Sequence, residues 1–145
     1  MTNKLPKTSR SLPIALLRAR ERVMGPIRDM LADVDITEQQ WRVLRVLCED
    51  GPQEPTRIAD KACLLLPSLT RILQNLENKQ MIEREVDQRD RRKQIVSATA
   101  RGERIIAENI GRSVEQMAAL QERLGQEKYE QLLDLLNELV ELDKT

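Results

Sequence analysis

The sequence contains no histidine and no phenylalanine, and its only aromatic residues are Trp41 and Tyr129. Histidine is the most frequent general base in enzymes and a common metal ligand, so its absence removes the usual parts of hydrolytic and metal-dependent sites. Cys48 and Cys63 are the only cysteines, and they form no CxxC pair. This pattern argues against a zinc site and a disulfide framework. No cofactor is expected, and an enzyme is the weakest class of function.

Long hydrophobic runs are also missing. No apolar stretch approaches the roughly 18 residues that span a bilayer. The basic segment MTNKLPKTSR lacks the apolar core of a secretory signal. We therefore expect a cytoplasmic protein that does not enter a membrane. Cys48 lies on an apolar stretch with Leu44 and Leu47, which predicts a buried, unreactive thiol rather than a redox sensor.

Charge is balanced overall but unevenly distributed. The 145 residues carry 24 Lys and Arg and 24 Asp and Glu. Residues 1–104 hold 20 of the basic and 15 of the acidic side chains, whereas residues 105–145 hold 4 basic and 9 acidic ones. This asymmetry indicates that one part of the chain faces a polyanion and that the other part serves a different purpose.

Hydrophobic periodicity predicts a mainly α fold with one small β-hairpin. Apolar residues recur at helical spacing from Leu12 to Leu31, and Gly25-Pro26 is a place where that helix can bend. Thr37 and Gln40 have the spacing of a capping box at the start of a second helix. The remaining elements are a short helix after Pro55, a polar-faced helix over 67–79, strands at 81–86 and 93–98 around a charged tip at 87–92, and helices from about residues 99 and 126.

This order of elements is typical of a winged helix-turn-helix. We expect a single domain over residues 1–145, with the winged-helix DNA-binding part at about 36–99. Residues at about 12–35 and 100–145 are expected to form a terminal-helix dimerisation region. The terminal helices are more apolar than a small winged-helix core can use, although packing within the chain must account for some of their leucines.

The polar face of residues 67–79 suits the major groove, which is wide enough for one helix. Arg71 can form paired hydrogen bonds with guanine. Other side chains on this face can contact base edges or phosphates: Ser68, Thr70, Gln74 and Asn75. An ordinary amphipathic helix whose polar face meets water is the alternative, and it would be the better interpretation if this helix stood alone.

The charged tip favours the DNA interpretation. Residues 89–93 read Arg-Asp-Arg-Arg-Lys. Extended arginines at a hairpin tip can enter a minor groove, where narrow A·T segments concentrate negative potential. Asp90 would hold a neighbouring guanidinium in position rather than meet the phosphates. The alternative is a solvated turn.

Three stretches together resemble the MarR family of bacterial winged-helix regulators: ITEQQWRVLRVL at 36–47, LPSLTRILQNLENK at 66–79 and DQRDRRKQIVSATARG at 87–102. The last stretch fits the family's D-x-R-D-x-R wing, which is followed by a strand and a Thr-x-x-Gly helix entry. The resemblance implies a homodimer formed by the first and last helices, bound to double-stranded DNA. Two recognition helices would then enter successive major grooves of a pseudo-palindromic operator, with half-sites about 34–36 Å apart.

The resemblance also assigns residues by motif position. It implies that four residues lie at the major groove: Pro67, Ser68, Thr70 and Arg71. It implies that Arg92 enters the minor groove and that Asp90 orients the wing, with Arg89 and Arg91 nearby. Gln80 stands where family members usually carry glycine. If that residue is left-handed, glutamine costs about 1 kcal/mol there.

Finally, the resemblance implies release from DNA by a small aromatic acid such as 4-hydroxyphenylacetate or 3,4-dihydroxyphenylacetate. A pocket for such an anion needs an apolar wall and a fixed cation. Two i, i+4 pairs offer these groups: Trp41 with Arg45, and Arg18 with Arg22. The alternative, which we weight more heavily, makes Trp41 a core residue and pairs the arginines with surface carboxylates.

The sequence thus favours a ligand-released repressor of an aromatic-acid catabolic operon. One alternative is a winged-helix module that binds protein instead of DNA, and another is a MarR-like regulator with a different effector. The arginine-rich tip argues against the protein-binding module, and salt-dependent binding to duplex DNA would discriminate between the two.

Overall fold

The computed structural model describes residues 4–143, and these form six α-helices, a short 3-10 helix and a two-stranded hairpin. The elements in chain order are η1 Thr8–Arg10, α1 Leu12–Ala32, α2 Glu38–Asp50, α3 Pro55–Lys61, α4 Leu66–Asn78, β1 Ile82–Val86, β2 Gln94–Ala98, α5 Ala100–Leu124 and α6 Gln126–Val140. The predicted fold class, mainly helical with a hairpin wing, is confirmed. No helix in the described part of the chain is both long and apolar enough to cross a membrane.

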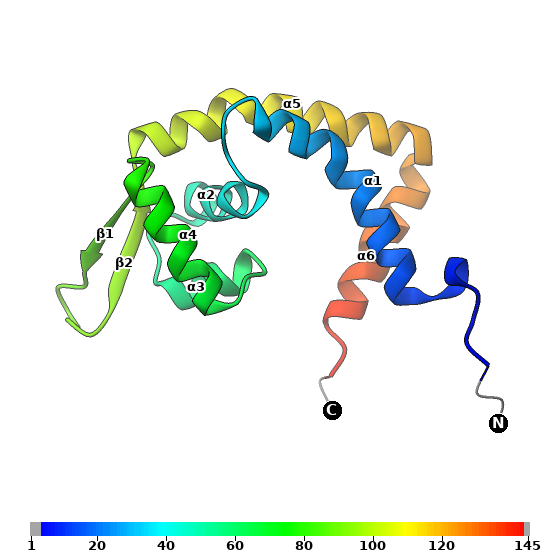
Figure 1. The fold of residues 1–145 in the computed structure, drawn as a ribbon, viewed down its shortest axis with the longest axis horizontal. Coiled ribbons are helices and arrows are strands. Elements are labelled where there is room, and N and C mark those ends of the chain that lie inside the picture. The colour runs from blue at the N-terminus through cyan, green and yellow to red at the C-terminus, as the bar shows by residue number, and fades with distance from the viewer. Residues whose placement is uncertain (1–3, 144–145) are drawn as a thin grey trace.

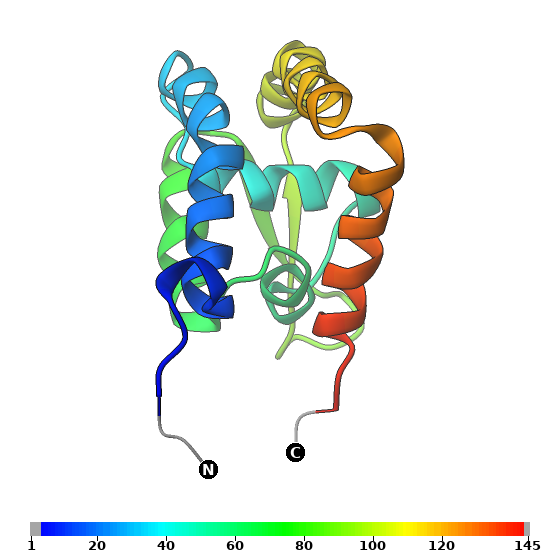
Figure 2. The ribbon, with the colours of Figure 1, turned by 90° about the vertical axis from the view of Figure 1, so that its right-hand side faces the viewer.

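The chain forms an arch (Figure 1). Helix α5 runs along its top, and α2, α3, α4 and the hairpin form a lobe at one end. The first half of α1 and the whole of α6 descend at the other end, and the view turned by 90° shows them as two separate columns (Figure 2). We call residues 12–22 and 126–140 the terminal legs. Helix α1 contains Pro26 and changes direction along its length, as expected where proline removes a helical hydrogen bond.

The core lies in the lobe, beneath α1 and α5. The start of α2 matches the predicted capping box, because the Gln40 backbone N–H donates to Thr37 Oγ1 at 3.1 Å and the Thr37 N–H donates to Gln40 Oε1 at 3.1 Å. Trp41 is buried one turn into the helix. The largest fully buried side chains include Leu44, Ile58, Leu69, Leu73, Leu76 and Val96, which come from α2, α3, α4 and β2. Because each of these elements buries one face in the same core, the position of α4 relative to the hairpin is fixed.

The hairpin is antiparallel and pairs Ile82 with Ala98 at its base and Val86 with Gln94 near its tip. A third segment joins at the middle of β2, where the Gln53 N–H donates to the Val96 carbonyl at 3.0 Å and the Val96 N–H donates to the Gln53 carbonyl at 2.8 Å. This additional bridge attaches the wing to the chain between α2 and α3.

The backbone of Gln80 is left-handed, with φ of 61°. It closes α4, because its N–H donates to the Glu77 carbonyl and the Met81 N–H donates to the Leu76 carbonyl, each at 2.9 Å. The left-handed conformation costs glutamine about 1 kcal/mol relative to glycine. Thr99 Oγ1 donates to the Gln80 carbonyl at 2.7 Å and so helps to hold this turn.

The expectation of a buried Cys48 is wrong. Leu44 and Leu47 lie on the buried face of α2, but Cys48 is turned away from it and is exposed. Partial desolvation and, secondarily, the Glu103 carboxylate raise the pKa of the Cys48 thiol. The thiol therefore stays protonated at neutral pH, which agrees with the expected low reactivity although the burial was wrong.

Candidate DNA-binding site

Helix α4 has one apolar face and one polar face. It begins at Leu66, one residue before the predicted start, so Pro67 is its second residue. Leu69, Leu73 and Leu76 are buried. The six residues that sequence reasoning assigned to DNA on this helix are all exposed: Pro67, Ser68, Thr70, Arg71, Gln74 and Asn75. The polar face is therefore free to meet a partner.

The exposed side chains on α4 differ in whether they already form hydrogen bonds within the protein. Within residues 4–143, the side chains of Arg71 and Asn75 make no hydrogen bond with another residue. The Thr70 hydroxyl donates to the Leu66 carbonyl at 3.1 Å. The Gln74 amide is held at both ends, because its oxygen accepts from Arg84 at 3.0 Å and its nitrogen donates to Asn78 at 3.1 Å. Arg71 and Asn75 are thus the freest groups to reach a base edge.

Arg84 ties the wing to α4 and was missed by sequence reasoning. Its guanidinium lies on β1 and donates to both carboxylate oxygens of Glu77, at 2.7 and 3.2 Å. This hydrogen bonding lowers the pKa of Glu77 and raises the pKa of Arg84, so both stay charged. Paired contacts of this kind fix an orientation as well as adding attraction. No spacing in the sequence indicates this pair, because the turn at Gln80 decides which residues of α4 and β1 meet.

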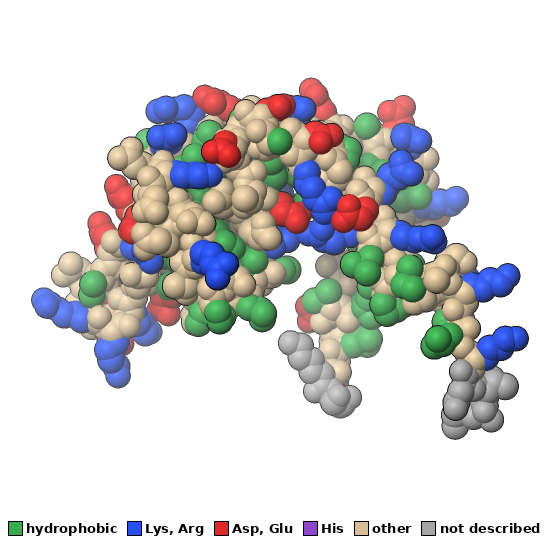
Figure 3. Space-filling model, in the orientation of Figure 1, with side chains coloured by type: hydrophobic (Ala, Val, Ile, Leu, Met, Phe, Trp, Pro, Cys, Tyr) green, Lys and Arg blue, Asp and Glu red, His purple; other side chains and the backbone are tan. Residues whose placement is uncertain are grey.

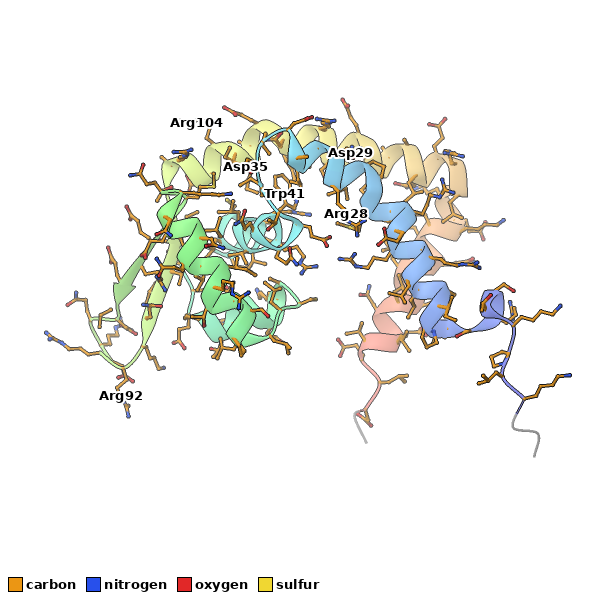
Figure 4. The ribbon with its side chains drawn as sticks, in the orientation of Figure 1. Arg28, Asp29, Asp35, Trp41, Arg92 and Arg104 are labelled. Carbon is orange, nitrogen blue, oxygen red and sulfur yellow. The ribbon has the colours of Figure 1, made fainter. Side chains whose placement is uncertain are left out.

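At the wing tip, Asp90 organises Arg92 as expected. The Asp90 carboxylate accepts from the backbone N–H of Arg92 at 3.1 Å and from Arg92 Nε and Nη2 at 3.0 and 3.2 Å. These bonds lower the pKa of Asp90 and keep it ionised. The Arg92 side chain remains 90% exposed, and Figure 4 shows it at the end of the hairpin. Arg89 and Arg91 are exposed beside it.

The wing tip and the first turn of α4 project to the same side of the lobe in both ribbon views (Figures 1 and 2). The space-filling view shows basic side chains gathered at that end of the hairpin (Figure 3). No side chain caps the N-terminus of α4, where Leu65 is the N-cap residue. Its first backbone N–H groups can therefore receive a phosphate. A polar helix face, a helix N-terminus and a basic tip together form one surface suited to a polyanion.

Two of the four predicted effector residues share a hollow. A space of about 700 Å³ lies between α1 and α5, and the guanidinium-bearing residues Arg18, Arg22 and Arg123 line it. Glu21 also lines it but is paired with Arg28 at 2.8 Å. The rest of its wall is Val23, Gly25, Pro26, Asp29, Gln116, Met117, Ala119 and Leu120.

The other two predicted effector residues do not line this hollow. Trp41 lies beneath α1 and α5 and is only 4% exposed (Figure 4). Arg45, one turn further along α2, is exposed. The structure therefore brings Arg18 and Arg22 to one hollow and places Trp41 in the core. The position of Trp41 agrees with the alternative interpretation, whereas the expected pairing of these arginines with surface carboxylates is not seen within residues 4–143. Residues 4–143 also contain no group of three or more His, Cys, Asp or Glu side chains that could hold a metal ion.

Known proteins resemble this chain over nearly its whole length. The MarR family profile matches residues 36–93. The HTH-type transcriptional regulator FarR of Neisseria gonorrhoeae is 40% identical over 92% of this chain and 91% of its own length. The homoprotocatechuate degradative operon repressor of Escherichia coli is 36% identical over 91% and 89%. The solved structure of NadR in complex with 4-hydroxyphenylacetate covers 99% of this chain and 100% of its own, with 37% identity and a TM-score of 0.82.

These matches confirm the family that the sequence motifs indicated and agree with the exposed recognition helix and wing. The chain belongs to the MarR family of DNA-binding transcriptional regulators and is not an enzyme.

Proposed function

We propose that this protein is a homodimeric repressor of an aromatic-acid catabolic operon, released from its operator by a small aromatic carboxylate. The observation that carries the DNA-binding part is that the first turn of α4 and the wing tip project to the same side of the lobe (Figures 1 and 2). The polar residues of α4 are exposed, and Arg92 lies at the wing tip (Figure 4). In this proposal α4 enters the major groove, with Arg71 reading guanine. Arg92 enters the adjacent minor groove, and Asp90 and Arg84 hold the wing in position.

The terminal legs support the dimer. None of the residues Gln126–Val140, all of which the structure describes, is buried. Exposed large hydrophobic side chains nevertheless crowd the legs: Leu12, Ile14, Leu16, Leu17, Leu132, Leu133, Leu135, Leu139 and Val140. Figure 3 shows hydrophobic side chains, coloured green, on the legs beside the opening of the arch. A monomer would leave these apolar side chains in water, whereas soluble monomers rarely expose large contiguous apolar patches.

We expect the native chain to sediment with twice the mass of one chain. Replacing Leu132 and Leu139 together with glutamate should yield monomers, because two charges would then be buried without partners. The matched control changes Gln131 to glutamate and Asn137 to aspartate, which adds the same charge to exposed polar positions of α6. A leucine double variant that sediments like the control would contradict dimerisation through α6.

The hollow between α1 and α5 supports an anionic effector. Arg18, Arg22 and Arg123 give it cationic groups, while Val23, Met117 and Leu120 give it an apolar wall. An aromatic ring with a carboxylate needs this combination. The relative whose name includes homoprotocatechuate and the structural neighbour bound to 4-hydroxyphenylacetate make 4-hydroxyphenylacetate and 3,4-dihydroxyphenylacetate the first compounds to test.

The test is fluorescence anisotropy of labelled duplex from the upstream region of the protein's own gene, with and without each acid. We expect either acid to release the duplex. An effector can do this only if it binds the free protein more tightly than the DNA-bound protein. Equal affinity for both forms, measured by calorimetry, would therefore rule out ligand-induced release.

Arg18→Ala and Arg22→Ala should each weaken effector binding about tenfold or more, because each removes a hydrogen bond to a charged group. Arg104→Ala is the matched control, since Arg104 is exposed on α5 outside the hollow (Figure 4). If Arg45→Ala abolishes effector binding and the two α1 variants do not, the effector binds against α2 instead. If duplex binds but neither acid releases it, the regulator responds to a different effector.

A further inference from the structure

Two leucines at the start of α4 are exposed and lie outside the hydrophobic core. Leu65 is 77% exposed and Leu66 is 44% exposed, whereas Leu69 on the next turn is fully buried. Leu64 is half-buried and packs against the core. Single exposed leucines are common on protein surfaces. Two in succession at the first turn of a recognition helix form a local apolar surface, which we call the leucine step.

The leucine step is continuous with the polar face of α4. Leu66, Thr70 and Gln74 are each four residues apart and so lie along one side of the helix. The Thr70 hydroxyl is bonded to the Leu66 carbonyl, which orients it within this row. Figure 3 shows hydrophobic side chains at the lower rim of the lobe, on the side toward which the basic wing tip also projects. With α4 placed in the major groove as proposed, a duplex that contacts Arg71 and Arg92 would also lie against the leucine step.

The chemistry of this first turn is unusual for a surface that binds a polyanion. The nine residues from Ala62 to Thr70 carry no charge. Pro67 has no backbone N–H, so Ser68 is the main polar group that the first turn can offer to a base. The leucine step consequently has little capacity to read the donors and acceptors of a base pair. What it offers is apolar contact.

The 5-methyl group of thymine is the one apolar group that base pairs present in the major groove. We propose that Leu65 and Leu66 read thymine by packing against its 5-methyl group at the operator positions beneath the first turn of α4. This inference rests on the proposed placement of α4 in the major groove. It adds a second specificity element, because Arg71 would select guanine by hydrogen bonds while the leucine step selects thymine by apolar contact.

Deoxyuridine substitution isolates the methyl group, because uracil pairs with adenine as thymine does and lacks only that group. We expect replacement of each operator thymine in turn to reveal one or two positions per half-site at which affinity falls. Burying one methyl contributes a factor of about four in affinity, so matched positions in two half-sites should together cost about fifteenfold. This measurement uses the unmodified protein and does not depend on any variant folding.

The second arm measures the operator affinity of a variant in which Leu65 and Leu66 are both replaced by alanine, and compares it with that of the native protein. It should bind the thymine operator as weakly as the native protein binds the deoxyuridine operator, and it should be insensitive to the substitution. Val114→Ala is the matched control, since Val114 is 60% exposed on α5. This control should keep the full response to the methyl group.

Three outcomes would overturn the proposal. In the first, deoxyuridine at every position leaves the affinity unchanged, which leaves DNA binding intact and removes only the thymine reading. In the second, the double alanine variant loses as much affinity to the substitution as the native protein does. In the third, the double alanine variant sediments as a monomer, which would assign the leucine step to contact with a second copy. Absence of any salt-dependent duplex binding would instead overturn the proposed function itself.

Discussion

Replacing Gly102 with alanine is expected to destabilise the protein by about 3 kcal/mol or more, a large part of the roughly 5–15 kcal/mol that stabilises a typical domain. A Cβ atom at this position would lie 2.3 Å from the carbonyl oxygen of Met81 and 3.2 Å from Leu44 Cδ2. The Met81 carbonyl cannot move aside easily, because it accepts a hydrogen bond from the Thr99 N–H at 3.0 Å. The start of α5 therefore rests directly on the start of the wing.

The matched control for this substitution is Gly111→Ala, in the same helix. A Cβ there meets no atom within 4 Å. Alanine should therefore stabilise α5 by about 1 kcal/mol through its higher helix propensity. Thermal unfolding should show a melting temperature about 10 °C lower for the first variant and about 3 °C higher for the second. Both must be measured at one protein concentration, because dimer stability depends on concentration. Equal melting temperatures for the two variants would contradict the close contact at Gly102.

Arg71→Ala is expected to reduce operator affinity about 30-fold or more and to relax the preference for guanine at one position of each half-site. A paired arginine–guanine contact contributes about 1–3 kcal/mol of discrimination, and a dimer contains two of them. The Arg71 side chain is available for this contact, since it is exposed and makes no hydrogen bond within residues 4–143. Anisotropy titrations against operators with each base at the responsive position measure both effects.

Arg92→Ala serves as the contrasting variant. It should weaken binding to operator and random duplex alike, because a cation in the minor groove responds to electrostatic potential more than to base identity. The plot of log affinity against log salt should become shallower by about 2 for a dimer, one for each wing. Arg104→Ala should change neither quantity, since Arg104 lies on α5 away from the wing tip. Loss of base preference in the Arg92 variant, but not in the Arg71 variant, would reverse the proposed roles of helix and wing.

Much of this fold follows from local sequence signals. The Thr37 capping box and the polar-faced helix α4 depend on residues a few positions apart, and each appears where the pattern predicts it. The Gln80 turn is equally local, because its two closing hydrogen bonds reach back only to Glu77 and Leu76. The wing contact could also be predicted from the sequence, since Asp90 and Arg92 are two residues apart in a tight turn.

Features that depend on contacts between distant parts of the chain could not be predicted from the sequence. Cys48 was expected to be buried because its neighbours are apolar, but the rotation of α2 against the core turned it outward. The Arg84–Glu77 contact depends on how β1 leaves the Gln80 turn. The grouping of Arg18 with Arg123 across the hollow requires α1 and α5 to pack together, although the two residues are far apart in sequence.

The sequence by itself determined the order of elements, the polar face of α4, the basic wing tip and the family, because helix periodicity, caps and short motifs act over a few residues. Only the tertiary structure decided which cations share the hollow, that Trp41 belongs to the core, and that the first turn of α4 projects to the same side as the wing tip. These last features depend on how helices pack against one another. That packing is set by the summed fit of many side chains rather than by any local pattern.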